Sequence, residues 1–491
     1  MILLNPINNN LNRKQHSCFG TNFKSRDVFA CFNSMRRLDV DTFQYSFDKV
    51  CDRGLASYEK DDIKLQLKKI DNDLKNLEEK KLYLERLLDY DKLRQNGFEA
   101  FAVRRFVNED NLSIKKAQDY LDKNKILRER MFGYPANLTE DSAVTKYLRK
   151  KENELPLTNN CGDPFDSGNY LMDSKEYEIA ILNKLFEHFG LDLSKKPWGY
   201  ITTGGSESNK WGIYNGLRKF PEGRVYYSDS AHYSVPKAVK LGFDKSDNDI
   251  TLIKHTNIQA KNNSEKIDTD MLLFEIRKNW DINKEPAIIL LTLGTTKTGA
   301  VDDIELISKT LKSENIPHYI HLDAALYGGI AKNQINAPTV PNIEYLGVDS
   351  VSVSLHKYFG NHDVKSVVIS KEPPVASKVD YIGQIDSTTA GSRTFNPFSS
   401  LQRITETLDR KFPNEYCENV LFFENLLKEK NIKFTREENA NIFVLDKPSD
   451  EICKKYQLST FDDNGVEKCH VIIFPYHKKE MMSQLINEIK F

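Results

Sequence analysis

Apolar and polar positions follow two alternating patterns between residues 198 and 373. The apolar runs have the length and the β-branched content of buried strands: WGYITT, RVYYS, AIILLTLGT, YIHLDAAL, SVSVS and SVVIS. The segments between them repeat apolar residues at helical spacing: NKWGIYNGLRKF, DTDMLLFEIRKNW and DIELISKTLKSEN. Strands that alternate with helices predict an α/β fold with a mainly parallel sheet covered on both faces. We expect this large domain within residues 125–372.

The pattern changes after Pro373. Two long helical patterns are followed by the apolar runs NIFVLD and HVIIF and by a closing helix. This order predicts a smaller α+β domain over residues 373–491.

The chain before residue 125 has a different pattern. Residues 61–93 carry apolar side chains at a 3-4 spacing that only Lys81 interrupts: Ile63, Leu67, Ile70, Leu74, Leu77, Leu84 and Leu88. This heptad pattern predicts a coiled coil or helical hairpin, and one amphipathic helix packed on its own domain explains it equally well. With the later helical pattern SIKKAQDYLDKNKILRERM, it makes residues 1–124 a predicted N-terminal helical extension.

Composition narrows the functional classes. The 491 residues carry a net charge of −1, which provides no electrostatic reason to expect nucleic acid or an anionic membrane as a partner. No apolar run approaches the roughly 20 residues that span a bilayer. The seven cysteines are scattered without a Cys-x-x-Cys pair, so we expect reduced thiols in a cytoplasmic protein and no structural metal site.

Two of the predicted strands end in segments that could bind a ligand. TTGGSESN joins a strand to a helix, and Gly205 and Ser206 would place backbone amides at the helix N-terminus, where phosphate binds well. A glycine-rich turn is also common without any ligand. In SAHYSVPKAVKLG, His232 follows a strand, although a lone histidine is more often a surface or core residue.

Two further strands end in an acid and in a base. Asp323 in HLDAALYGG ends an apolar strand, where a carboxylate needs a partner or serves as a helix N-cap. Lys357 in SLHKYFG could form a Schiff base with an aldehyde, and burial would assist by lowering its pKa. An ordinary exposed lysine is the alternative.

Together the four segments supply what pyridoxal 5'-phosphate needs. They offer a phosphate-binding turn, an aromatic-stacking histidine, an acid for the pyridine nitrogen and a lysine for the aldehyde. In this order they resemble the pyridoxal-phosphate-dependent group II amino-acid decarboxylases, and among these the bacterial histidine decarboxylases. The resemblance covers about residues 125–491 and is carried by long segments: NNCGDPFDSGNYLMDS, WGYITTGGSESN, FPEGRVYYSDSAHYSVPKAVKL, LGTTKTGAVDDI, HLDAALYGG and SLHKYFG.

The resemblance implies a fold-type-I, aminotransferase-like architecture and a homodimer with active sites at the subunit interface. It also implies decarboxylation of an L-amino acid to an amine and CO2, with histidine to histamine as the favoured reaction. The alternatives are a decarboxylase or lyase acting on another polar amino acid, an aminotransferase, and a catalytically silent scaffold.

The resemblance also assigns roles around the reacting atoms. Lys357 would be the Schiff-base lysine, and Asp323 would partner the pyridine nitrogen. Ala325 would pack its methyl group against the ring. His232 would stack on the opposite face and contact the substrate carboxylate.

Other residues would bind the rest of the cofactor. Gly205 and Ser206 would bind the phosphate with Ser354 and His356, and Thr295 would lie near the ring oxygen.

One loop departs from these relatives. After HKYFG the chain reads NHDVKS, where the relatives carry a largely uncharged loop. If the loop faces the site, Asn361 and Asp363 would contact substrate, and Asp363 would favour a cationic or imidazole side chain. In the alternative, these charges point to solvent.

Overall fold

The computed structural model describes residues 114–241, 243–244, 250–251, 253–261, 264–329, 342–409 and 414–489. The heptad pattern of residues 61–93 lies outside the described residues. Residues 114–491 form one compact unit.

The larger sheet confirms the predicted parallel architecture. Its strands are β1 (Trp198–Thr202), β2 (Arg224–Ser228), β5 (His255–Ile258), β6 (Ala287–Thr292), β7 (His318–Asp323), β8 (Ser350–Ser354) and β9 (Ser366–Ser370). They are ordered β1-β9-β8-β7-β6-β2-β5, and β9 is antiparallel to both of its neighbours. The remaining pairings are parallel. The apolar runs identified each of these strands except the half-exposed β5.

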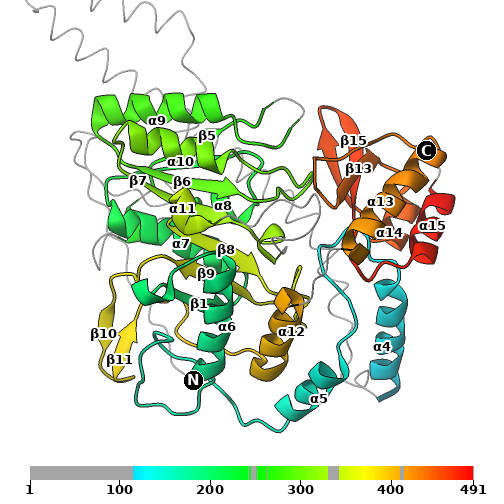
Figure 1. Cartoon of the computed structure of the whole chain (residues 1–491), viewed down its shortest axis with the longest axis horizontal. Helices are drawn as coiled ribbons and strands as arrows, with labels where there is room; N and C mark the ends of the chain where they lie inside the picture. The colour runs from blue at the N-terminus through cyan, green and yellow to red at the C-terminus, as the bar shows by residue number, and fades with distance from the viewer. Residues whose placement is uncertain are drawn as a thin grey trace, which may run out of the picture. The chain divides into compact units, whose positions relative to one another are not determined.

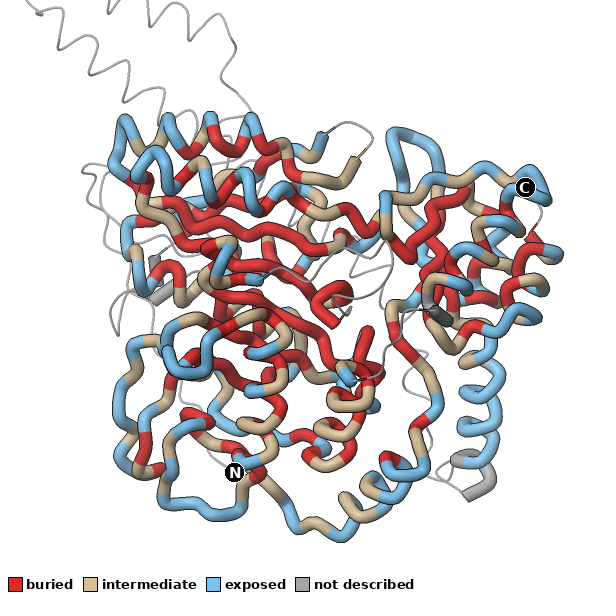
Figure 2. The backbone as a smooth tube through the Cα atoms, in the orientation of Figure 1, coloured by how far each residue is buried: buried red, intermediate tan, exposed pale blue. Residues whose placement is uncertain are grey.

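Helices cover both faces of this sheet, as its alternating side chains require. Helices α7 (Gly205–Lys219) and α8 (Ser234–Lys240) cover one face, and α6 (Lys175–His188), α9 (Thr269–Asn283) and α10 (Ile304–Ser313) cover the other. In β7, Tyr319 belongs to the α7–α8 core, whereas Ile320 and Leu322 belong to the core on the opposite face. Figure 1 shows α9 and α10 side by side, and Figure 2 shows that the strands are mostly buried while the helices are exposed on their outer sides.

Strand β8 shows how polarity divides the two faces. Its sequence is SVSVS, and Val351 and Val353 pack into the core opposite α7. The intervening serines are also buried and face α7, where Ser350 and Ser352 form hydrogen bonds with side chains of α7 and β7. The strand therefore brings hydroxyl groups to the α7 side of the sheet.

The smaller sheet confirms the predicted C-terminal α+β region. Its strands are β12 (Phe434–Thr435), β13 (Ile442–Asp446), β14 (Ser459–Asp463) and β15 (Val466–Ile472), all antiparallel, in the order β12-β13-β15-β14. The helices of this region are α13 (Asn414–Glu429), α14 (Asp450–Lys455) and α15 (Lys479–Glu488). The sequence pattern did not reveal β14, which is largely exposed.

The remaining elements complete the described part of the chain. They are α4 (Ile114–Arg128), α5 (Ala143–Glu152), η3 (Leu193–Lys195), β3 (Phe243–Asp244), β4 (Ile250–Thr251), η4 (Tyr327–Gly329), α11 (Ile343–Leu346), β10 (Ser377–Val379), β11 (Gln384–Asp386) and α12 (Pro397–Asp409). Helix α12 packs against α5 and α6. The domain limits at residues 124 and 372 stay predictions.

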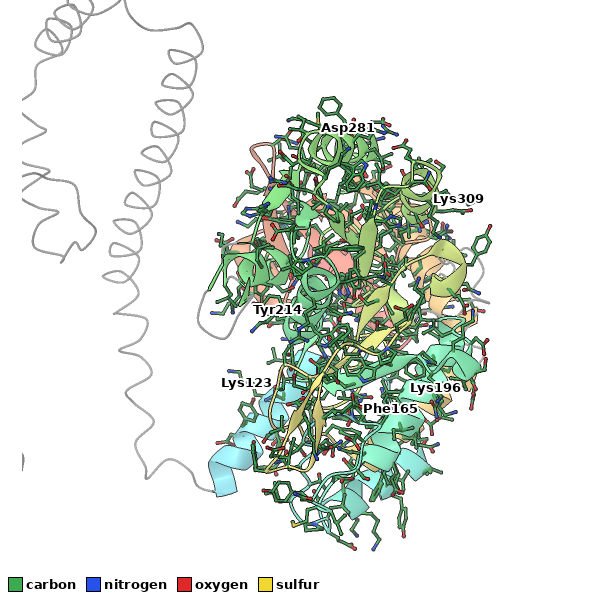
Figure 3. The ribbon with its side chains drawn as sticks, turned by 90° about the vertical axis from the view of Figure 1, so that its left-hand side faces the viewer. Lys123, Phe165, Lys196, Tyr214, Asp281 and Lys309 are labelled. Atoms are coloured by element: carbon green, nitrogen blue, oxygen red, sulfur yellow. The ribbon has the colours of Figure 1, made fainter. Side chains whose placement is uncertain are left out.

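Charged side chains lie on the outer helices. Lys123 of α4, Asp281 of α9 and Lys309 of α10 are exposed and project outward (Figure 3). Within the described residues, no helix combines the length and the apolar character needed to cross a membrane.

Candidate active site

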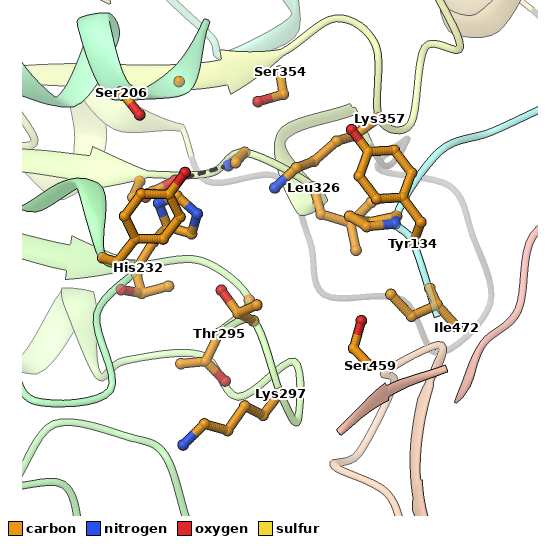
Figure 4. Close-up of a pocket in the computed structure, with 18 of the residues that line it drawn as sticks. Tyr134, Ser206, His232, Thr295, Lys297, Leu326, Ser354, Lys357, Ser459 and Ile472 are labelled. Atoms are coloured by element: carbon orange, nitrogen blue, oxygen red, sulfur yellow. Dashed lines mark hydrogen bonds between the residues drawn. The ribbon is translucent and has the colours of Figure 1, made fainter. Parts of the chain in front are cut away.

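A cavity of about 680 Å³ opens where parallel strands of the larger sheet end, and the smaller sheet forms its other wall. Ligands of open α/β sheets bind at this carboxyl edge. Nine of the residues predicted from the sequence line the cavity: Gly205, Ser206, His232, Thr295, Asp323, Ala325, Ser354, His356 and Lys357. Figure 4 shows Ser206 and Ser354 toward one end, Lys357 reaching inward, and His232 across from it.

The Ser206 end has the chemistry of a phosphate site. The first-turn amides of α7 have no carbonyl partner within the helix, and a helix N-terminus favours an anion. Gly204 precedes this turn with a φ of 154°, and a side chain built there would meet nothing within 4 Å. A Cβ on Gly205 would lie 3.4 Å from Ser354 Oγ, which places that hydroxyl beside the helix end. These groups fit a phosphate.

Lys357 lies just beyond β8, and its amine lines the cavity. Burial lowers the pKa of Lys357, and the nearby Asp323 carboxylate partly opposes this shift. The local backbone is held in place because Asn137 N–H donates to the Lys357 carbonyl at 2.9 Å. His356, the preceding residue, has Nδ1 3.0 Å from the Lys365 carbonyl. Lowering the pKa increases the fraction of neutral, nucleophilic amine.

Asp323 is the carboxylate at the end of β7. It is 7% exposed, and its Oδ2 accepts a hydrogen bond from Asn209 Nδ2 at 2.7 Å. Its Oδ1 accepts from the backbone N–H of Ala325 at 3.1 Å. The side chain therefore caps its own turn and is not the N-cap of an α-helix. A buried carboxylate that faces a cavity is suited to binding a cationic group there.

His232 has a defined hydrogen-bonding pattern. Its Nδ1 lies 2.8 Å from Ser234 Oγ and accepts from the Ser234 backbone N–H at 3.3 Å. Ser234 Oγ itself accepts from Asn209 Nδ2 at 3.0 Å, so its hydrogen is free to donate to Nδ1. Burial lowers the pKa of His232, and a neutral ring with Nδ1 as acceptor carries its hydrogen on Nε2. His232 is therefore a donor through Nε2.

Asn209 is a site residue that the sequence reasoning missed. Its amide donates to both Asp323 and Ser234, so it joins the acid and the histidine of the cavity. Residues four apart on a helix share a face. The position of Asn209 four residues after Gly205 could therefore have indicated that its side chain faces the same site.

Thr295 and Ala325 also line the cavity as expected, but the Thr295 hydroxyl is already engaged. Thr295 Oγ1 lies 3.0 Å from Thr298 Oγ1 and accepts from the Ala300 N–H at 3.0 Å. These contacts close a local turn.

The wall formed by the smaller sheet was not foreseen. It contains Ile442, Ser459, Thr460, Phe461, His470 and Ile472. The Gly133 carbonyl accepts from Ser459 Oγ and lies 3.0 Å from His470 Nε2, which ties the Tyr134 segment to this sheet. Nothing in the sequence of β14 indicated a site.

Asn361 and Asp363 lie outside the cavity in the described part of the chain. Asn361 is buried and donates to Ser400 Oγ at 2.9 Å, and Asp363 accepts from the Asn396 N–H at 3.3 Å. The loop reaches the cavity through Val364 instead. Neither residue lines the cavity of its own chain, and their contact with substrate stays a prediction.

Comparisons with known proteins agree with this geometry. Residues 221–389 match the pyridoxal-dependent decarboxylase conserved domain. The chain is 33% identical to a histidine decarboxylase of Pseudomonas entomophila over 373 residues, which are 73% of this chain and 85% of that protein. It is 31% identical to one of Acinetobacter baumannii over 382 residues, 75% of this chain and 93% of that protein.

A solved structure shares the fold. L-methionine decarboxylase from Streptomyces sp. 590 superposes with a TM-score of 0.63 at 20% identity, covering 78% of this chain and 95% of that one. Identity above 30% over most of both proteins, on a shared fold, shows that this chain belongs to the pyridoxal-dependent decarboxylase family and is an amino-acid decarboxylase whose cofactor is pyridoxal 5'-phosphate.

Proposed function

We propose that this enzyme decarboxylates L-histidine to histamine and CO2. The main support for this active site is one observation. A single cavity is lined by a phosphate-binding turn and by Lys357, Asp323 and His232. The choice of histidine is supported by the histidine decarboxylases, which align with this chain over most of their length.

The chain's residues would hold the cofactor at three points. Ser206, Ser354 and the first turn of α7 would bind its phosphate, Lys357 its aldehyde carbon and Asp323 its ring nitrogen. When bound, pyridoxal phosphate supplies an electron sink for the pair released as CO2 departs. Asp323 would support this sink, because a carboxylate beside the ring nitrogen would stabilise a proton there.

His232 and Lys357 would act on the substrate. The Nε2–H of His232 is a hydrogen-bond donor suited to the substrate carboxylate, which it would orient for departure. Burial lowers the pKa of Lys357, so its amine gives up a proton more readily than an exposed lysine does and could exchange one with the substrate. The amino-acid side chain would extend toward Ser459 and Phe461 on the wall formed by the smaller sheet.

Substrate identity is tested by incubating the purified holoenzyme with each common amino acid and measuring CO2 and amine together. We expect histidine to give the highest kcat/KM, with CO2 and histamine in equal amounts. A higher kcat/KM with another amino acid would overturn the substrate. A ketone product without CO2 would indicate transaminase chemistry.

We further propose a cytoplasmic homodimer, in which the partner completes the cavity. The family resemblance supports the dimer, and the reduced thiols of Cys161, Cys453 and Cys469 are consistent with a reducing compartment. Light scattering coupled to size exclusion would give twice the 56.7 kDa chain mass. A monomer with full activity would contradict the dimer.

We also propose that the N-terminal extension of residues 1–124 precedes a catalytic core with the domain limits given above. Because residues 114–491 form a compact unit, deletion of residues 1–113 should leave a folded protein that binds cofactor. An insoluble or cofactor-free product would contradict this organisation.

A further inference from the structure

A chain of hydrogen bonds, most of them buried, leads to Asp323 on the face of the larger sheet that α7 covers. It links Asn215 Nδ2 to Tyr319 Oη (3.1 Å), Tyr319 Oη to Ser350 Oγ (2.7 Å), Ser350 Oγ to His321 Nδ1 (2.7 Å), His321 Nε2 to Asn209 Oδ1 (3.2 Å) and Asn209 Nδ2 to Asp323 Oδ2 (2.7 Å). Tyr319, His321 and Asp323 alternate along β7, so they point to the same face.

The direction of every donor in this chain follows from its neighbours. The Tyr319 hydroxyl accepts from Asn215 and donates to Ser350, so the Ser350 hydrogen is left to donate to His321 Nδ1. Burial lowers the pKa of His321 to about 4, which keeps the ring neutral. A neutral imidazole that accepts at Nδ1 carries its hydrogen on Nε2, which donates to Asn209 Oδ1. Donors therefore point toward Asp323 along the whole chain.

The Asn209 amide is where this chain meets the cavity. Its Oδ1 accepts from His321 Nε2 and from Ser352 Oγ at 2.8 Å, and its NH2 group donates to Asp323 and Ser234. If the amide rotated by half a turn, its oxygen would face the Asp323 carboxylate and its NH2 group would face two donors. The His321 and Ser352 donors therefore determine the orientation of the amide.

Helix α7 leaves space for the His321 ring. A Cβ built on Gly212 would lie within 2.5 Å of three ring atoms of His321. Only glycine at this position allows the imidazole to lie against the helix, one turn beyond Asn209. The space that Gly212 leaves for the ring is therefore a second observation, besides the 3.2 Å distance, that places His321 Nε2 beside Asn209.

We propose that His321 is a positioning residue for the reaction. By holding the Asn209 amide in one orientation, it keeps the Asn209 N–H donating to the Asp323 carboxylate, which would face the cofactor's ring nitrogen, and through Ser234 it keeps the hydrogen of His232 on Nε2. This inference rests on the proposed function, because it assumes that Asp323 faces the ring nitrogen.

The test uses holoenzyme reconstituted with pyridoxal phosphate whose ring nitrogen carries a nitrogen-15 label. The chemical shift of that nitrogen reports its protonation at a fixed pH. His321→Phe keeps an aromatic ring but removes both nitrogen atoms. We expect a shift toward the unprotonated ring nitrogen, a fall in kcat of about 10- to 100-fold and a change in KM below about threefold.

Rescue separates positioning from packing. His321→Gln offers an amide N–H near the position of Nε2, so it should recover most of the wild-type nitrogen signal, whereas Phe should not. Gly212→Ala, which would displace the ring, should change the nitrogen signal in the same direction as His321→Phe. A Gln variant no better than Phe, with both variants folded by circular dichroism, would contradict a positioning role.

His318→Phe is the matched control on the same strand. The His318 ring bonds locally, with Nδ1 2.7 Å from the Ile316 carbonyl, so its replacement should leave the nitrogen signal unchanged. If His321→Phe does not fold, Tyr319→Phe removes a single hydroxyl of the chain and should produce a smaller shift in the same direction.

Asp323→Asn distinguishes failure of the positioning role of His321 from failure of the proposed function. A wild-type nitrogen signal in His321→Phe, together with a lost proton in Asp323→Asn, would overturn the inference and leave the proposed function intact. A wild-type signal in Asp323→Asn would overturn the role of Asp323 itself.

Discussion

The two walls of the cavity differ in how their residues are arranged along the chain. On the larger sheet, Ser206, Asp323 and Lys357 lie at the end of a strand or within a few residues after it, each in a short motif that contains small residues. On the smaller sheet, Phe461 and His470 lie within strands, among residues of ordinary composition. The first wall carries reactive groups, and the second offers shape and contact area.

This difference has a physical basis. Cofactor chemistry needs particular groups at particular strand ends, where parallel strands place them together. A side-chain pocket needs only complementary surface, which many residue types can provide. Changes on the first wall should therefore lower kcat by orders of magnitude, and changes on the second should act mainly on KM.

Lys357→Ala should produce the largest effect. Loss of the amine removes the group that would hold the cofactor's aldehyde and carry a proton, so kcat should fall by about 10,000-fold or more. Phosphate contacts should retain some cofactor. Borohydride reduction followed by peptide mapping checks the assignment in the wild type, where label on another lysine would contradict it. Lys365→Ala, on the following loop, is the matched control and should keep wild-type kcat.

Asp323→Asn should have the next largest effect. The amide keeps the size of the side chain but cannot stabilise a proton on the ring nitrogen. We expect cofactor to stay bound while kcat falls by roughly a thousandfold, on the order of 4 kcal/mol. Steady-state kinetics measures the loss of kcat, and the absorbance of bound cofactor shows whether it is retained. Near-wild-type turnover would mean that a group other than Asp323 stabilises the proton on the ring nitrogen.

The contrast between the walls also explains what sequence reasoning could reach. The strands of the larger sheet and the residues at their ends were predictable because apolar runs and motif residues are local signals. Asn209 lies in TTGGSESN and His321 in HLDAALYGG, but their roles depend on a contact between a helix and a strand that are more than 100 residues apart in the sequence. The residues of β14 carried no local signal, because the strand is exposed and its position depends on long-range pairing with β15.

Phe461→Ala should test the wall of the smaller sheet. The Phe461 ring lies 5.3 Å from Lys297 Nζ and forms part of the cavity surface. Its loss should raise KM for the best substrate by about 3- to 10-fold with kcat nearly unchanged. Val466→Ala, in the same hairpin but outside the cavity lining, is the matched control. A drop in kcat with constant KM would mean that this wall takes part in the chemistry.

Asp363→Asn should have the smallest effect on kinetics and a visible effect on stability. Among the described residues, Asp363 Oδ1 is buried without a hydrogen-bond partner, and burial raises the pKa of this carboxyl. A raised folded-state pKa means that the folded protein binds the proton more tightly than the unfolded chain does. Stability is therefore lost as pH rises from the unfolded pKa through the folded one.

The neutral amide avoids that loss. Asp363→Asn should unfold at a higher temperature than the wild type at about pH 8, and the difference should vanish near pH 3, where the carboxyl is protonated in both states. Scanning calorimetry at the two pH values measures this directly. Because Asp363 lies outside the cavity of its own chain, KM for histidine should stay within about twofold. A clear rise in KM, without a gain in stability, would instead support the contact with substrate predicted from the NHDVKS loop. The residues that select the substrate would then include this loop as well as the smaller sheet.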